Sequence, residues 1–238
     1  MRLSLSACGI AAIGLMLLAL AGPSYRIGLL SLDNAFTLLR WAAYVGGAAI
    51  VLSVVAGGLA YPRRERGQML VAVVGLLGGL TALGIPAEWL RRARNVPPIH
   101  DITTDLENPP VFEAVVPLRA DAPNSLERPS ELTELQREGY PDLVPITLPI
   151  PLEQAFSRAL AAAQQDGWEI VTADKGSGRI EATDTTRWFG FKDDIVVRLT
   201  PWGAGTRVDV RSVSRVGRSD TGTNARRIRR YLNRLQSN

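Results

Sequence analysis

Three long apolar segments in the first 94 residues constrain the fold more than any other feature of this sequence. Residues 3–22 and 42–61 each contain twenty residues without a charged side chain, and residues 69–87 are almost as long. A membrane-spanning helix needs about 20 predominantly apolar residues. A helix that packs on a soluble core would show a polar face, and these segments show none. They predict three transmembrane helices, at about 3–22, 42–61 and 69–87.

The first segment has two other interpretations. Met1 and Arg2 give a short charged start, and residues 19–21 (ALA) are a passable signal-peptidase site. Residues 5–8 (LSAC) have the shape of a lipobox, but Cys8 comes too early, with no hydrophobic region before it. We favour an uncleaved helix.

The arginines next to the spans give conflicting signals for orientation. Three arginines at 63–66 lie between the second and third spans and mark that loop as cytoplasmic by the positive-inside rule. This orientation places the C-terminal half outside the cytoplasm. Three arginines at 91–94 follow the third span and argue for the opposite orientation. We take the first orientation and expect a multi-pass membrane protein with an extracytoplasmic domain.

The spans carry small residues but no acid, lysine or histidine. Gly75 and Gly79 form a GxxxG pattern, which lets helices approach closely in lipid, although glycine-rich membrane sequence is an equally good interpretation. We predict helix–helix association through these two glycines. Because an ion or proton pathway normally needs an ionisable side chain within the membrane, the sequence disfavours a transporter.

The rest of the chain, residues 95–238, is predicted to be a soluble domain distinct from the transmembrane region, residues 1–94. Residues 95–194 have eighteen acids and eight bases, whereas residues 195–238 have ten arginines and two acids. The domain is therefore slightly acidic in total, unlike the basic surface that nucleic acid requires, and we expect no nucleic-acid partner. With Cys8 and His100 as the sole cysteine and histidine, a Cys/His zinc site is excluded.

The periodicity of the soluble half predicts an α+β domain. Leu152, Phe156 and Ala159 fall on one face of a helix over residues 151–167, with Gly167 as its C-terminal cap. Two hairpins follow, and a last helix over residues 220–235 is capped by Asp220 or Thr221. The order helix, four-stranded antiparallel meander, helix gives the fold class. Its strands are expected at 168–173, 179–183, 195–200 and 206–216, a weaker strand at 111–118, and a short helix within 130–139 capped by Ser130.

Alternation assigns the two faces of the sheet. One face would be apolar and covered by the two helices, and the other would be polar. The apolar face is expected to carry Ile195, Val197, Leu199, Val208 and Val210, and the polar face Arg198, Arg207, Asp209, Arg211 and Arg215.

The strongest candidate site is a set of arginines beside the start of the last helix. A helix N-terminus offers free backbone N–H groups, and arginine forks hold phosphate or carboxylate through paired bonds. We predict a site for an anionic small molecule or lipid headgroup, formed by Arg198, Arg211, Arg215, Arg218, Asp220, Asn224 and Arg227. The alternative is internal pairing of these arginines with Asp193, Asp194, Glu181 and Asp209.

Two secondary candidates carry carboxylates. His100 beside Asp101, with Thr104 and Asp105 nearby, suggests a base and its orienting acid, or else an ordered loop held by turn hydrogen bonds. Adjacent carboxylates on a strand point to opposite sides, so Asp193 and Asp194 favour arginine pairing over metal binding. We predict no metal site, no cofactor and no catalytic residue.

Three stretches of the soluble half resemble the domain-of-unknown-function 1499 family, over about residues 95–236. They are PPIHDITTDLENPPVF at 97–112, RIEATDTTRWFGFKDDIVVRL at 179–199 and RVDVRSVSRVGRSDTGTNARRIRRYL at 207–232. The resemblance implies a bacterial or plastid protein, often with membrane or secretion segments ahead of the domain, and here a bacterial inner membrane. It implies no activity, cofactor or catalytic residue, and the three spans lie outside it.

These observations predict binding of a ligand but do not predict a chemical reaction. We expect a membrane-anchored protein whose soluble domain binds an anionic ligand, lipid headgroup or partner through an arginine-rich face. The alternatives are a hydrolase or transferase that uses His100 and the arginines, and a structural component of an envelope assembly.

Overall fold

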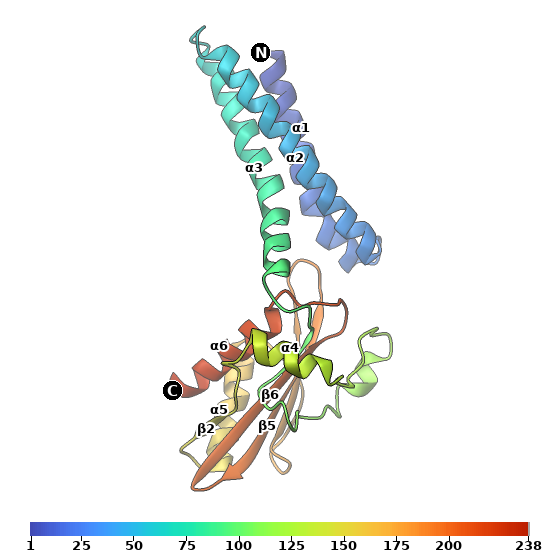
Figure 1. Ribbon diagram of the computed structural model, residues 1–238, viewed down its shortest axis with the longest axis vertical. Coiled ribbons are helices and arrows are strands. Elements are labelled where there is room, and N and C mark those ends of the chain that lie inside the picture. The colour runs from blue at the N-terminus through green and yellow to red at the C-terminus, as the bar shows by residue number, and fades with distance from the viewer. Residues whose placement is uncertain (238) are drawn as a thin grey trace. The chain divides into compact units, whose positions relative to one another are not determined.

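The computed structural model describes residues 1–237 and divides into two compact units. The helical unit consists of Met1–Arg92 together with three residues from much later in the chain, Trp188–Gly190. The soluble unit consists of Ala93–Arg187 and the chain from Phe191 onward. Figure 1 shows the fold of each unit.

The helical unit contains α1 (Arg2–Arg26), α2 (Leu32–Ala60) and α3 (Arg66–Arg94), except for the last two residues of α3, Ala93 and Arg94, which belong to the soluble unit. All three are long and apolar enough to cross a membrane, as the sequence predicts. They are longer than the predicted spans, and α3 continues past residue 87 to Arg94. α2 begins at Leu32, well before the predicted span at 42–61, and the side chain of Ser31 accepts a hydrogen bond from the backbone N–H of Asn34 (3.3 Å).

Small residues let these helices approach closely within one chain. A Cβ atom on Gly79 would lie 2.8 Å from the carbonyl oxygen of Gly46, and one on Gly46 would lie 2.8 Å from that of Gly79. A Cβ on Gly75 would lie 2.7 Å from the hydroxyl oxygen of Ser53 and 3.2 Å from the backbone nitrogen of Cys8. Both GxxxG glycines thus pack against other helices of the same molecule.

The soluble unit is built on a six-stranded antiparallel sheet within the described residues. The predicted meander is confirmed as β3 (Glu169–Asp174), β4 (Arg179–Thr185), β5 (Lys192–Trp202) and β6 (Gly205–Ser214). Two short strands, β1 (Asp101–Thr103) and β2 (Ile146–Leu148), pair with successive parts of β6, opposite β5.

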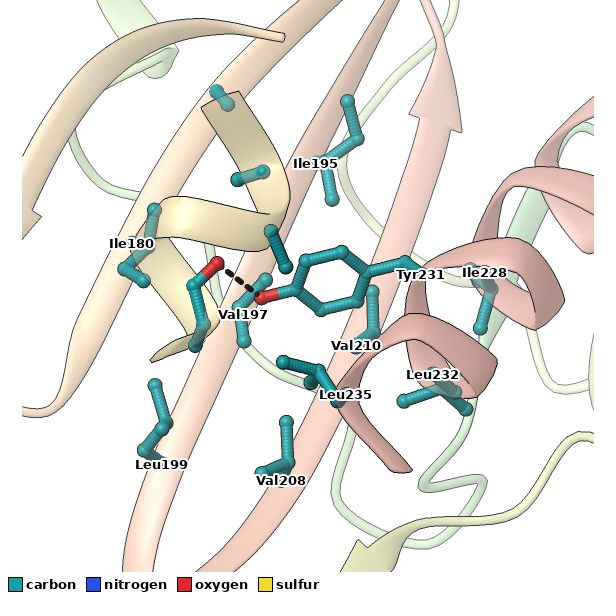
Figure 2. Close-up of a cluster of buried hydrophobic side chains, with 14 of the residues drawn as sticks. Ile180, Ile195, Val197, Leu199, Val208, Val210, Ile228, Tyr231, Leu232 and Leu235 are labelled. Atoms are coloured by element: carbon teal, nitrogen blue, oxygen red, sulfur yellow. Dashed lines mark hydrogen bonds between the residues drawn. The ribbon is translucent and has the colours of Figure 1, made fainter. Parts of the chain in front are cut away.

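The apolar face of the sheet is covered by α5 (Leu152–Gln165) and α6 (Thr223–Ser237), as expected. The five apolar residues predicted for this face are all buried in one cluster with both helices (Figure 2). Tyr231 stacks on Trp168, with ring centroids 4.7 Å apart, and its hydroxyl donates to the carbonyl oxygen of Ala159 (2.9 Å). These contacts hold α6 against α5 and the sheet.

The opposite face of the sheet is covered by residues 104–130, here named the covering segment, which connect β1 to α4 (Glu131–Gly139). The strand predicted over residues 111–118 is wrong: turns lead into a 3-10 helix, η1 (Val116–Arg119), with a proline in its first turn. Two apolar side chains that precede η1, Phe112 and Val115, form a small second core with Val196 and Val213 of the sheet. The short helix α4 is present as predicted, but the Ser130 side chain makes no capping hydrogen bond.

Candidate functional site

The polar face of the sheet carries the predicted arginines, and the covering segment lies over them. Arg211 on β6 donates from Nε and Nη2 to the two carboxylate oxygens of Asp101 on β1, at 3.0 and 2.8 Å. Its remaining donors reach the backbone oxygens of Pro110 and Leu126. Arg128 forms a second ion pair with Asp101 at 3.1 Å. Arg211 therefore links the sheet edge to the covering segment and has little exposed surface left.

A second buried cluster surrounds Asp194 on β5. Its carboxylate accepts bonds from Arg215 (2.9 and 2.8 Å), from the hydroxyl of Thr183 (2.7 Å) and from Arg119 of η1. Burial alone would raise the pKa of Asp194, but the bonds from Arg215, Thr183 and Arg119 outweigh burial and lower that pKa. Arg215 also donates to the carbonyl oxygen of Leu118 (2.7 Å), so it too holds the covering segment.

A third cluster lies further along the same face. Arg198 and Arg207 both pair with Asp105 (3.0 and 2.8 Å) and with Asp209. Hydrogen bonding to Asp209 raises the pKa of Arg207. The positive charges of the two guanidinium groups are thus balanced by the negative charges of the two carboxylates.

The start of α6 is satisfied internally as well. The last helix begins at Thr223 and not at residue 220 as predicted, and the Asp220 side chain accepts from the backbone N–H groups of Gly222 and Asn224. Burial is the largest influence on Asp220 and raises the pKa of its carboxyl group. Asn224 bonds to the hydroxyl of Ser212 (2.7 Å) and to the carbonyl oxygen of His100 (3.0 Å). The backbone N–H groups of Gly222, Thr223 and Asn224, which could otherwise hold an external anion, are therefore already used.

Arg227 lies on the helix side of the sheet, away from the other arginines. It pairs with Asp193 (2.6 Å) and Asp184 (2.8 Å) and is 2% exposed in its side chain. Asp193 and Asp194 thus face opposite sides of β5, as their adjacent positions predict. No group of three or more His, Cys, Asp or Glu that could hold a metal ion occurs within residues 1–237.

The structure does not assemble the base and acid suggested for His100. Both carboxylate oxygens of Asp101 bond to arginines, and no hydrogen bond between them and the His100 imidazole occurs among the described residues. Thr104 donates through its backbone N–H to the carbonyl of Val210, and its hydroxyl accepts from the backbone N–H of Val210. These contacts are those of an ordered segment that continues β1.

A hollow of about 290 Å³ opens between the covering segment and α4. Arg137, Arg207, Asp105 and Tyr140 contribute its polar groups, and leucine, valine and proline side chains form its walls. Both arginines already pair with acids: Arg207 with Asp105 and Asp209, and Arg137 with Glu134 and Glu107. The hollow therefore lacks an uncompensated charge.

Three arginines of the soluble unit differ from this pattern and are here named the surface arginines: Arg94, Arg218 and Arg226. All three are exposed, and none forms an ion pair with a carboxylate among the described residues. Arg94 is the last residue of α3. The loop with Arg218 is tied to the same stretch of chain, since Asp220 donates through its backbone N–H to the carbonyl of Ile99 (3.2 Å).

Arg226 lies near the chain that follows α3. A Cβ atom placed on Gly222 would lie 3.0 Å from Nη1 of Arg226 and 3.4 Å from a methyl group of Val96, two residues after α3. Arg226 donates to the backbone oxygen of Thr221 (3.0 Å) and to the hydroxyl of Thr223 (3.1 Å), which are both neutral. Of the predicted ligand-binding residues, Arg218 alone belongs to this group. Arg94 and Arg226 were not among the ligand-binding residues predicted from the sequence.

One protein family matches the soluble unit. The family described as "Protein of unknown function (DUF1499)" matches residues 101–235, which include all the paired arginines of the sheet face. A search of curated proteins finds no match. The matched residues exclude α1 to α3 and Arg94, and they include Arg218 and Arg226.

Proposed function

We propose the following function for this chain, which belongs to the DUF1499 family: it is a multi-pass membrane anchor whose soluble domain binds anionic lipid headgroups through the surface arginines. Its three helices would span a bacterial inner membrane, with the domain outside the cytoplasm. The arginines of the sheet face would serve to hold the domain together.

The observation that carries the proposal is the difference between paired and unpaired arginines. Arg198, Arg211, Arg215 and Arg227 each pair with the protein's own aspartates. Arg94, Arg218 and Arg226 keep an uncompensated positive charge at the surface. An uncompensated guanidinium fork suits a phosphate group, because it can donate two parallel hydrogen bonds to it.

The place of Arg94 in the chain supports a lipid as the source of that phosphate. Tryptophan gathers at the headgroup level of membrane proteins, and Trp89 lies near the end of α3. From Trp89 to Arg94 the helix rises only about 8 Å. A basic group that close to an anionic surface contributes about 1 kcal/mol to its attraction.

The test is a thermal-unfolding measurement on the full chain in a neutral detergent. Phosphatidylglycerol should raise the unfolding midpoint more than phosphatidylcholine does, and added salt should reduce the difference. The variant R218Q/R226Q should lose about 2 kcal/mol of lipid binding, about a 30-fold loss of affinity. The matched control is R137Q/K175Q, which removes two exposed cations elsewhere on the soluble unit.

Two outcomes would reject the proposal. One is an equal midpoint shift for both lipids. The other is an equal loss in the two double variants, which would mean that net charge matters and position does not. If glycerol 3-phosphate without acyl chains gives the same shift as the lipid, the ligand is a soluble phosphate.

A further inference from the structure

The helical unit contains a backbone carbonyl that its own helix cannot satisfy. Pro23 lies inside α1. Proline has no N–H, so it cannot donate to the carbonyl oxygen four residues earlier, which is that of Ala19. Proline is tolerated in membrane helices where a neighbouring group satisfies the carbonyl that it leaves free. The indole Nε1 of Trp188 donates to the Ala19 oxygen at 3.3 Å.

The helix is also shaped to admit this indole. Gly22 is buried, and a Cβ atom at that position would lie 2.6 Å from Cδ1 of Trp188 and 2.8 Å from both Cγ and Nε1. Real Cβ contacts are essentially never so short, so any residue other than glycine would displace the ring. Ala19, Gly22 and Pro23 therefore form one feature, here named the α1 notch.

The residues beside Trp188 extend the contact. Phe189 is 4% exposed, and its ring centroid lies 6.0 Å from that of Tyr25, 5.8 Å from that of Phe36 and 6.1 Å from that of Trp89. These three partners come from α1, α2 and α3 respectively. The ring of Trp188 also meets that of Trp89 at 5.1 Å. Each of the three helices thus contributes an aromatic side chain to the packing around Phe189.

We propose that the α1 notch is a receptor for Trp188, and that the helical unit reaches its full stability only when the loop between β4 and β5 supplies this side chain. The bundle would then be completed by residues made long after α3 in the chain. This inference is independent of the surface arginines, since it concerns the packing of the helical unit.

A double-mutant cycle tests the hydrogen bond. W188F keeps an aromatic ring but removes the indole N–H, and P23A restores the backbone donor that the Ala19 carbonyl lacks. The full chain has a single thiol, Cys8 in α1, so its reaction with a fluorogenic maleimide during heating reports unfolding of the helical unit. With Pro23 present, W188F should lower the midpoint by about 2–4 °C. In the P23A background, the loss should be at most half as large.

The control for this cycle is W202F, which changes a tryptophan that is 59% exposed and should leave the midpoint unchanged. An equal loss from W188F in the natural and P23A backgrounds would overturn the hydrogen-bond part of the proposal. No loss in either background would overturn the receptor role altogether.

A second comparison tests the notch by its shape. G22A should lower the midpoint, because the new methyl group meets the indole, whereas G9A in the same helix should not, since nothing lies within 4 Å of its Cβ position. In a W188A background G22A should become harmless. If G22A remains equally damaging there, its effect does not arise from Trp188, and the proposal fails. None of these variants should change the preference for phosphatidylglycerol, so the two proposals can fail separately.

Discussion

Arg211 and Asp101 form a buried, two-bond ion pair, with Nε and Nη2 of the guanidinium 3.0 and 2.8 Å from the two carboxylate oxygens. Arg211 lies on β6, inside the sheet, and Asp101 on β1 at its edge. The pair joins segments more than a hundred residues apart in sequence. An arginine that could have bound a ligand is instead part of the framework of the domain.

The first prediction follows from that pair. Arg211→Leu removes the stronger partner of a buried carboxylate, and breaking a buried pair typically costs about 3–5 kcal/mol of unfolding free energy. Because Arg128 still pairs with Asp101 (3.1 Å), we expect the lower end of that range. Chemical denaturation of the full chain in detergent measures the loss. Arg137→Leu, at an exposed pair, is the control and should change stability by about 0.5 kcal/mol or less; a similarly small effect of Arg211→Leu would refute the structural role.

The second prediction concerns how the covering segment is held. Glu181 on β4 is fully buried and accepts from the backbone N–H groups of Glu113 (2.8 Å) and Val115 (2.9 Å). Glu181→Gln places an amide N–H against one of these donors, so a buried donor loses its partner, at a cost of about 1–3 kcal/mol. The segment should then open more often and be cut faster by a protease at low concentration. The exposed Glu169→Gln is the control, and an unchanged cutting rate in the Glu181 variant would show that this carboxylate does not hold the segment.

The third prediction concerns acid. The bonds from Arg215, Thr183 and Arg119 overcome the effect of burial and lower the pKa of Asp194 in the folded protein. In the unfolded chain an aspartate titrates at about 3.9. The stability that Asp194 contributes is therefore complete above about pH 4 and is lost as the pH falls through the lower folded value.

Asp220 should act in the opposite direction. Burial raises the pKa of its carboxyl group in the folded state, so its ionised form costs stability at neutral pH, and that cost declines as the pH falls.

The measurement for Asp194 is a set of melting curves between about pH 7 and pH 3. Stability should fall less steeply towards acid pH in Asp194→Asn than in the natural protein. Asp121→Asn, at an exposed position, should leave this fall unchanged. An identical fall in the Asp194 variant would contradict the assignment.

The sequence was a good guide wherever one local pattern decided the outcome. The apolar stripe of Leu152, Phe156 and Ala159 predicted α5, and Gly167 follows that helix with φ +82°, where glycine is favoured. Strict alternation in β5 and β6 assigned both faces of the sheet correctly. The distribution of charged residues also raised the possibility that the arginines pair with acids of the same domain. The structure has such pairs with Asp193, Asp194 and Asp209.

The failures came where distant residues decide. Residues 101–103 and 146–148 are too short to show a period, and they become strands because β6 offers open backbone bonds on its free edge. Phe112 and Val115 belong to a segment that alternates like a strand but packs as turns, because Glu181 takes its backbone donors. The contact of Trp188 depends on Gly22 and Pro23, which no local pattern connects to it.

The most direct test of the account is the number of phosphatidylglycerol molecules that the full chain retains, counted by native mass spectrometry from mixed micelles. The account predicts that R218Q/R226Q retains fewer than the natural protein, while R137Q/K175Q retains as many. It also predicts that Arg211→Leu, measured at a temperature where it stays folded, keeps its lipid. Loss of lipid from the Arg211 variant with none from R218Q/R226Q would contradict the division between structural and lipid-binding arginines.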